Sequence, residues 1–221
     1  MKFLLEQNPF NNPKEVLKNI SLETINFQEW CIANPEECLA KISNNSNFYY
    51  IKNKGWLIEG DIYLKNKNLT YIPLKFYKVE GDFDISRNPN LKTLKNAPTI
   101  INGDLDASGI LLVSKEVANY FKKAKIQGDL YLDFNNLDKL INMPKIVNGN
   151  FYIYHNPNLK SLEGAPEKVM RDFRVEFCDI QDLGNTLKYV GGNFYIYSQK
   201  TKKWTEKEIR SKIEVKRGVH I

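Results

Sequence analysis

One glycine position recurs along this chain at nearly constant spacing. It lies in the pattern Val or Ile, any residue, Gly, Asp or Asn, apolar, any residue, apolar. The position is occupied in turn by Gly60, Gly81, Gly103, Gly128, Gly149, Arg171, Gly192 and Arg217. Successive copies are 21 to 25 residues apart. A period of this length over eight copies indicates one structural unit per repeat, stacked on its neighbours around a continuous core.

Each repeat carries the same local signals in the same order. Apolar residues alternate after the glycine position, which predicts a short strand with one face buried. Three residues after the last apolar strand residue, one further position is taken by Asn88, Asn135, Asn156, Cys178 and Gln199. Since a buried amide donates and accepts at once, we expect these amides to pair inward-pointing backbone groups where the strand ends. We expect Cys178 to be a buried structural thiol.

Two repeats are longer, because Gly103 and Gly128, like Gly192 and Arg217, are 25 residues apart. Both carry a helical pattern in the extra length. We expect one helix to begin at Ser114 as its N-cap. The other shows a capping box, with Thr205 at the N-cap and Glu208 three residues later. The longer repeats therefore predict helices on the outer, convex side.

Residues 1–50 lack the repeat and carry helix starts instead. Asn12-Pro13 and Asn34-Pro35 place Asn at an N-cap and Pro at the first helical position, and Asn26 with Glu29 suggests a third start. Because a solenoid must cover its open apolar end, we predict a helical N-terminal cap over 1–50 and a repeat domain over 51–221.

The cysteines and the apolar runs bear on the compartment. Cys31, Cys38 and Cys178 form neither a disulfide framework nor a CxxC pair, and we expect Cys31 and Cys38 in the core of the cap. The N-terminus has no signal-peptide core, and no apolar run is long enough to cross a bilayer. These features together predict a cytoplasmic protein in a reducing compartment, without membrane contact.

The repeats resemble those of a class of bacterial and bacteriophage leucine-rich-repeat proteins over about residues 56–221. Residues 156–166 are the clearest copy, and the helical ending from Trp204 is also similar. The resemblance implies a β-rich α/β leucine-rich-repeat solenoid with a curved parallel sheet of about eight short strands. Its convex side would be irregular, with two helical repeats. The family implies binding without a shared partner. With the Asn-, Lys- and Ile-rich composition, it suggests a phage-encoded inhibitor of a host defence protein.

The strand alternation also sorts residues onto a concave surface. Its outward positions hold nine acidic and two basic residues and six of the twelve tyrosines, although the whole chain has a net charge of +6. The first Asp or Asn after each glycine recurs so regularly that we interpret it as structural. The predicted partner-binding residues are Tyr63, Asp84, Asp106, Tyr131, Asp133, Tyr152, Tyr154, Arg174, Tyr195 and Tyr197. An acidic surface with tyrosines favours a protein partner over a phosphate backbone.

Other interpretations remain open. The tyrosines could simply stabilise a cross-strand ladder. A basic patch of Lys202, Lys203, Lys207 and Arg210 could bind nucleic acid, and the end strand at 215–221 could pair with another copy in a self-assembling structural protein. The sequence shows no metal-ligand spacing and no phosphate-loop, dinucleotide or nucleophile-elbow motif. We therefore expect a non-enzymatic protein without metal or cofactor.

Overall fold

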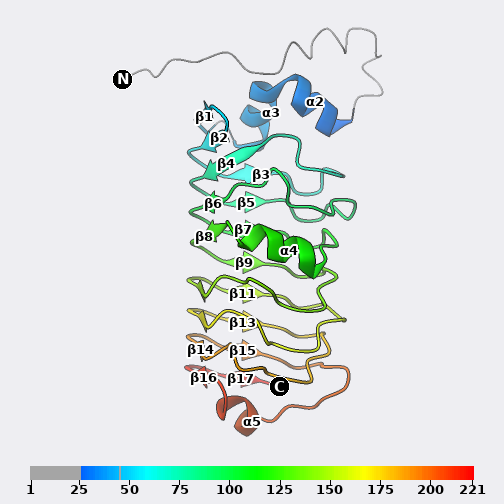
Figure 1. The fold of residues 1–221 in the computed structure, drawn as a ribbon, viewed down its shortest axis with the longest axis vertical. Coiled ribbons are helices and arrows are strands. Elements are labelled where there is room, and N and C mark those ends of the chain that lie inside the picture. Colours follow the sequence, from blue (N-terminus) through cyan, green and yellow to red (C-terminus); the bar gives the residue numbers. More distant parts are fainter. Residues whose placement is uncertain (1–25, 45) are drawn as a thin grey trace.

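The repeats form a β-solenoid of about eight turns, stacked in an elongated column (Figure 1). The computed structural model describes residues 26–44 and 46–221. The helix start expected at Asn12-Pro13 lies outside these residues. No helix in the described ranges is long and apolar enough to span a membrane.

Eight parallel strands, one per turn, form the sheet that the repeat pattern predicted. They are β3 (Ile62–Tyr63), β5 (Phe83–Asp84), β7 (Leu105–Asp106), β9 (Leu130–Tyr131), β11 (Phe151–Tyr152), β13 (Phe173–Arg174), β15 (Phe194–Tyr195) and β17 (Val219–His220). Equivalent residues pair in register, so Phe151 lies opposite Phe173 and Tyr152 opposite Arg174. The predicted sheet is therefore confirmed.

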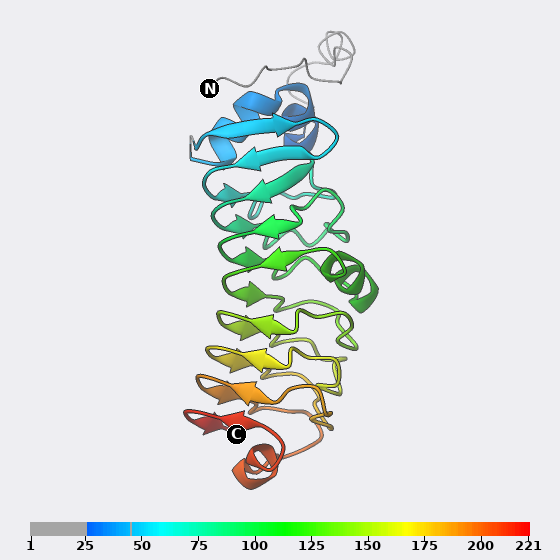
Figure 2. The ribbon, with the colours of Figure 1, turned by 60° about the vertical axis from the view of Figure 1, so that its left-hand side comes forward.

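A second row of strands, which the repeat pattern did not predict, precedes the glycine position in each turn. It consists of β2 (Gly55–Ile58), β4 (Phe76–Val79), β6 (Ile100–Ile101), β8 (Lys125–Ile126), β10 (Ile146–Val147), β12 (Lys168–Val169), β14 (Tyr189–Val190) and β16 (Glu214–Val215). This row is split into two sheets between β8 and β10. The glycine position lies at the corner between the two rows (Figure 2). The Val or Ile before each glycine thus belongs to a strand of its own.

The core is a stack of equivalent side chains from successive turns. Phe83, Phe151, Phe173 and Phe194 are fully buried. The ring of Phe173 stacks on Phe151 and on Phe194, with centroids 5.1 Å apart in both pairs. Removing one such ring costs about 3–5 kcal/mol, since the neighbouring turns cannot collapse into the space.

The Asn position after the strand has the predicted backbone role. Asn156 accepts a hydrogen bond from the Leu137 N–H at 3.1 Å and donates to the carbonyls of Leu132 and Ile153. Gln199 makes the same kind of contacts two turns later. Cys178, between them, is buried, and this burial raises the pKa of its thiol to about 12. It is therefore an inert thiol in a structural position.

The Asp or Asn after each glycine forms a second ladder, here called the corner ladder. Each side-chain Oδ1 accepts a hydrogen bond from the backbone N–H of the equivalent residue in the next turn; the residues are Asp61, Asp82, Asp104, Asp129, Asn150, Asp172 and Asn193. The regular Asp or Asn therefore satisfies backbone donors between turns, as its structural interpretation expected.

The corner ladder also explains the glycine. A Cβ added at Gly149 would lie 2.0 Å from Asp129 Oδ1, so the carboxylate of the preceding turn occupies the space of a side chain. At the two arginine positions, Arg171 and Arg217, the ladder residue of the preceding turn is Asn instead of Asp. The rule is thus Gly after Asp and Arg after Asn.

The longer repeats contain the two expected helices, α4 (Ser114–Phe121) and α5 (Glu206–Arg210). The Thr205–Glu208 capping box of α5 is confirmed. Ser114 is not the N-cap of α4, because Val113 takes that position and makes no side-chain cap. The Ser114 hydroxyl instead accepts from the backbone N–H groups of the next turn at residues 138 and 139. The Ser114 hydroxyl therefore bonds the backbone of the next turn instead of capping its own helix.

The N-terminal cap contains α2 (Phe27–Ala33) and α3 (Pro35–Ile42). The Asn26 side chain caps α2 by accepting from the Glu29 N–H, as predicted. Cys31 and Cys38 are fully buried in the cap, but they form a disulfide with Cα atoms 5.0 Å apart. The expectation of unpaired cysteines was wrong, because adjacent helices bring residues seven apart into contact. The cysteines therefore no longer support a reducing compartment.

The predicted cap region also contains an unpredicted strand, β1 (Phe48–Ile51), which pairs antiparallel with β2. Asn53 and Gly55 have positive φ and make the turn between the two strands. The cap therefore combines two helices with one strand that covers the open edge of the second row.

Candidate binding face

The outward surface of the eight-stranded sheet, here the eight-strand face, consists of parallel columns of side chains. After the corner ladder comes the strand column: Tyr63, Asp84, Asp106, Tyr131, Tyr152, Arg174, Tyr195 and His220. The edge column follows: Lys65, Ser86, Ser108, Asp133, Tyr154, Glu176 and Tyr197. The turn column is the next residue of each repeat: Asn66, Arg87, Gly109, Phe134, His155, Phe177 and Ser198. Backbone hydrogen bonds between turns keep these columns in register.

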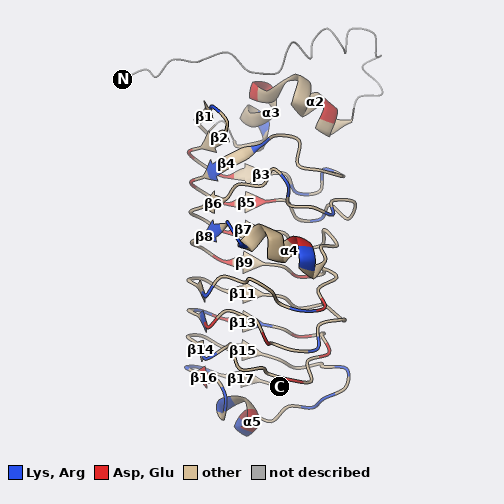
Figure 3. Ribbon diagram, viewed as in Figure 1, with Lys and Arg blue, Asp and Glu red and all other residues tan. Residues whose placement is uncertain are grey.

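The N-terminal part of this face is acidic. Asp84 and Asp106 are partly exposed and lie opposite each other on β5 and β7. Each accepts a backbone hydrogen bond from the serine two residues later, and Asp84 also lies 3.6 Å from the Lys65 ammonium. Burial raises the pKa of Asp106. Figure 3 shows acidic colour at β5 and basic colour at β4 and β8, so the two strand rows differ in charge in these turns.

Two of the six predicted tyrosines are bonded to the corner ladder. The Tyr63 hydroxyl donates to Asp61 Oδ2 at 2.8 Å, and the Tyr131 hydroxyl donates to Asp129 Oδ2 at 2.9 Å. Burial and this hydrogen bond raise the pKa of Tyr131. The Tyr131 ring also lies 4.8 Å from that of Tyr152. These two hydroxyls are therefore held by the fold and are less free to bond a partner.

Arg174 lies among the other tyrosines. Its guanidinium carbon is 5.1 Å from the Tyr195 ring centroid, 5.5 Å from that of Tyr154 and 5.9 Å from that of Tyr152. It forms an ion pair with Glu176 Oε1 at 2.5 Å, which raises the pKa of Arg174. Only 1% of Glu176 is exposed, and its Oε2 has no hydrogen-bond partner among the described residues. A buried carboxylate thus holds one cation among three aromatic rings.

Asp133 does not lie on the surface where the sequence placed it. Only 3% of the residue is exposed. Its Oδ1 accepts from the Tyr154 N–H at 3.0 Å, and its Oδ2 lies 3.5 Å from the Ser108 hydroxyl. Burial raises its pKa to about 8. The alternation of the strand predicts which side the Asp133 side chain faces, but it does not show that larger neighbouring side chains cover it. Asp133 therefore lies beneath the exposed surface of the eight-strand face.

The turn column contains an aromatic stack that the sequence analysis missed. The ring of His155 lies between Phe134 and Phe177, at centroid distances of 4.4 and 4.5 Å and interplanar angles of 11° and 9°. Phe134 is 49% and Phe177 44% exposed. The sequence signal for this stack is an aromatic residue at the same repeat position in three consecutive turns.

These three residues also have strained backbones. Their φ angles are 52°, 53° and 54°, in the left-handed region that bulky residues rarely adopt. Such a conformation costs about 1–3 kcal/mol per residue. Since other turns use Asn66 or Gly109 at the same position, folding does not require an aromatic side chain there.

Edge contacts join the stack to the tyrosines of the face. Tyr154 packs its ring against Phe134 at 5.3 Å, and Tyr197 packs against Phe177 at 5.8 Å. Tyr195 stacks on His220 at 4.3 Å. The resulting surface, here the aromatic patch, comprises Phe134, Tyr152, Tyr154, His155, Arg174, Phe177, Tyr195 and Tyr197. It brings together five of the ten predicted residues and adds three.

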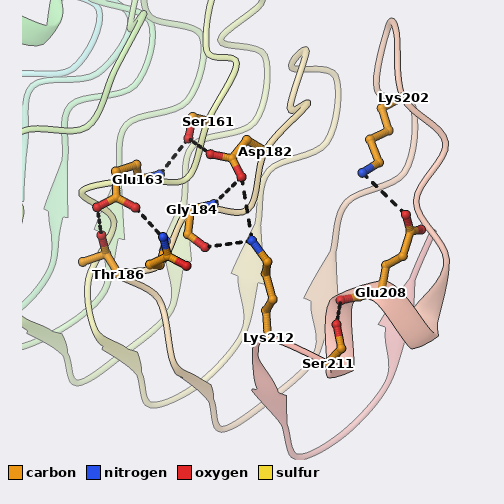
Figure 4. Close-up of polar contacts among 10 residues, drawn as sticks. Ser161, Glu163, Asp182, Gly184, Thr186, Lys202, Glu208, Ser211 and Lys212 are labelled. Atoms are coloured by element: carbon orange, nitrogen blue, oxygen red, sulfur yellow. Dashed lines mark hydrogen bonds and ion pairs between the residues drawn. The ribbon is translucent and has the colours of Figure 1, made fainter.

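The predicted basic patch near α5 is partly neutralised within the chain. The Lys202 ammonium lies 3.5 Å from Glu208 Oε1 (Figure 4). It is also 3.5 Å from the Trp204 ring centroid. Arg210 pairs with Glu206 at 2.7 Å and donates to backbone carbonyls. Lys203 and Lys207 are exposed. Two of the four charges are therefore compensated.

A different set of lysines surrounds a hollow of about 480 Å³ beside α4. Lys54, Lys75, Lys95 and Lys123 line it together with one acidic residue, Glu116. The Lys54 ammonium lies 4.7 Å from the Tyr77 ring centroid, and Lys75 donates to the Asn53 carbonyl. The hollow therefore brings four lysines and one glutamate around a single cavity.

The described residues were compared with metal-binding arrangements, and the whole chain with known proteins. Within residues 26–44 and 46–221, no group of three or more His, Cys, Asp or Glu side chains could hold a metal ion. No family model, no curated protein and no solved structure matches the chain.

Proposed function

We propose that this chain is a non-enzymatic protein-binding module and that the aromatic patch on the eight-strand face is its binding site. The observation that carries the proposal is the Phe134–His155–Phe177 stack, which is exposed and held on a strained backbone. The left-handed backbone recurs in every turn of the column and belongs to the repeat, but the repeat does not require bulky aromatic side chains there. Bulky residues kept in this costly conformation point to function. Clustered exposed aromatic residues with an arginine are the usual energetic centres of protein interfaces.

The charges around the patch favour a protein over a nucleic acid. Asp84 and Asp106 are partly exposed beside it, while Arg174 is already paired with Glu176. A phosphate backbone would be repelled by this acidic part of the face. A protein with basic residues around an apolar centre complements it. The resemblance to phage leucine-rich-repeat proteins extends the proposal to an inhibitor that occupies a host protein.

The test compares variants of the full chain in affinity capture from nuclease-treated lysate, followed by affinity measurement with the purified captured protein. The Tyr152→Ala/Tyr195→Ala variant should lose the partner, because it removes two rings around Arg174. Tyr49→Ala is the matched control, since Tyr49 is 48% exposed but lies on β1, away from the patch. Equal capture by both variants would show that the patch is not the site.

A second candidate function is nucleic-acid binding at the lysine hollow beside α4. The four lysines around one cavity favour it. A labelled 20-nucleotide RNA should then bind with an affinity that falls steeply with salt, and Lys54→Glu/Lys123→Glu should abolish binding. Lys203→Glu/Lys207→Glu is the control, because it changes the same charge near α5. Salt-independent binding, or equal loss in both variants, would exclude this site.

A further inference from the structure

The turn column has one position without a side chain. Its register is set by backbone hydrogen bonds from Arg87 to Ser108, from Gly109 to Asp133 and from Phe134 to Tyr154. Gly109 therefore lies between Arg87 and Phe134 in the column, and all three have φ between 52° and 63°. Equivalent side chains one turn apart stack directly, as Phe134 and His155 do.

The space at this position is open. A Cβ added at Gly109 would meet no atom closer than the Arg87 backbone at 3.9 Å, whereas a Cβ at the corner glycine Gly103 would lie 2.2 Å from Asp82 Oδ1. Gly109 is not needed to avoid a clash. The glycine leaves a gap of two strand spacings, roughly 10 Å, between the side chains of Arg87 and Phe134.

Both walls of this gap suit a flat ring. His155 covers one face of the Phe134 ring, so the other face is turned towards Gly109. On the opposite side, Arg87 is exposed, and its guanidinium has no hydrogen bond or ion pair with the described residues. A guanidinium binds the face of an aromatic ring, and a phenyl ring stacks on it. Leu111, two residues after Gly109, adds exposed apolar surface in the same turn.

The charges around the gap determine which kind of flat chemical group could bind in it. A second guanidinium would be repelled by Arg87, while a nucleobase would bring its phosphate towards Asp84 and Asp106 on the neighbouring strands. An aromatic amino-acid side chain is flat, neutral and free of phosphate. It is therefore the group that the two walls and the acidic surroundings accept together.

We propose that an aromatic side chain of the protein partner inserts at Gly109, between the Phe134 ring and the Arg87 guanidinium, and extends the stack by one ring. This inference rests on the proposed protein-binding function and names the group that the site recognises. Insertion would place the ring at the spacing of the existing stack, 4.4 Å from Phe134. The partner supplies the side chain that the repeat itself omits.

The test is NMR titration of the isotope-labelled full chain with N-acetyltryptophanamide. We expect saturable shifts of the Gly109 amide and of the Phe134 ring protons, caused by the ring current of the inserted indole. N-acetylleucinamide should cause at least roughly tenfold weaker effects, because it cannot stack. Adenosine monophosphate is the nucleobase probe, and tighter binding of this probe would overturn the proposal.

Gly109→Asn fills the gap with a residue that tolerates positive φ, and it should abolish the shifts. Ser198→Asn makes the same kind of change at φ 56° at the other end of the column and should leave them unchanged. Phe134→Asn removes one wall without changing the turn and should also abolish them. Shifts that persist in Gly109→Asn, or no saturable shift in the original chain, would overturn the inference.

The captured partner separates this inference from the proposed function. If Tyr152→Ala/Tyr195→Ala loses the partner and Gly109→Asn weakens it by roughly tenfold or more, both stand. If the tyrosine variant loses the partner but Gly109→Asn binds it normally, the aromatic patch remains the site and insertion at Gly109 is excluded.

Discussion

The corner ladder and the turn column belong to the same repeats, yet they differ in how much their residues vary and in what their side chains contact. The corner ladder holds Asp or Asn in all seven turns, and each side chain bonds the backbone of the next turn. The turn column changes from Asn66 to Arg87, Gly109, Phe134 and onwards, and its side chains face solvent or each other. The corner ladder has nearly the same residue in every repeat because stacking of the turns requires its hydrogen bonds. The turn column varies from turn to turn on a strained backbone, so stacking of the turns does not explain which residues occupy it.

The largest effect should come from breaking the corner ladder. Gly149→Ala places a Cβ 2.0 Å from Asp129 Oδ1 and displaces the carboxylate from the Asn150 N–H. We expect a loss of about 2–4 kcal/mol in the free energy of unfolding, measured by urea denaturation. Arg171→Ala is the control, because that corner already accommodates a side chain. Equal losses in both variants would refute the steric role of the glycine.

The next effect should come from Asp133, which is more buried than the residues of the corner ladder and of the turn column. Its folded-state pKa of about 8 is above the value of about 3.9 in an unfolded chain, so the folded protein holds the extra proton. The contribution of Asp133 to stability should therefore be fully present below about pH 4 and be lost as the pH rises towards about 8. Its neighbours Asp106 and Glu176 add to the raised pKa, while Ser108 and the Tyr154 N–H oppose it.

Asp133→Asn tests this pH dependence, because the amide oxygen can still accept from the Tyr154 N–H. Urea unfolding at several pH values should show a flatter profile for the variant and greater stability than the original chain near pH 8. Parallel profiles for the two proteins would mean that Asp133 is ionised throughout and that another group causes any decline.

A substitution in the turn column should change the affinity for the partner more than the stability of the fold. Phe177→Asn removes one stacking contact and also relieves the strain at φ 54°. Since the two terms are similar, stability should change by less than about 1 kcal/mol. The affinity for the captured partner should fall by roughly tenfold or more. A loss of several kcal/mol in stability would instead identify Phe177 as a structural residue. The turn column would then be needed for folding, as the corner ladder is.

The smallest effect should come from Tyr63, which lies outside the aromatic patch. Tyr63→Phe removes only an exposed hydrogen bond to Asp61. Thermal unfolding and partner affinity should both remain nearly unchanged, within about 0.5 kcal/mol. A clear loss of affinity would extend the binding site to the N-terminal turns and would restore the prediction that all six tyrosines contribute.

The sequence by itself determined the features that depend on the repeat period or on a few adjacent residues. The stacked strands, the Asn156 ladder position and the corner Asp recur at fixed offsets, and each finds its partner in the next turn at the same place. The Thr205–Glu208 capping box closes within three residues. For such features, position in the period is enough to identify the bonding partner.

The tertiary structure alone decided the side-chain contacts that the repeat period does not specify. It assembled the Phe134–His155–Phe177 stack, buried Asp133, paired Cys31 with Cys38 and gave Ser114 a partner in the following turn instead of its own helix. The period shows which residues share a column. The direction of each side chain and the space left by its neighbours depend on two or three turns packed together, and this packing is set only when the chain folds.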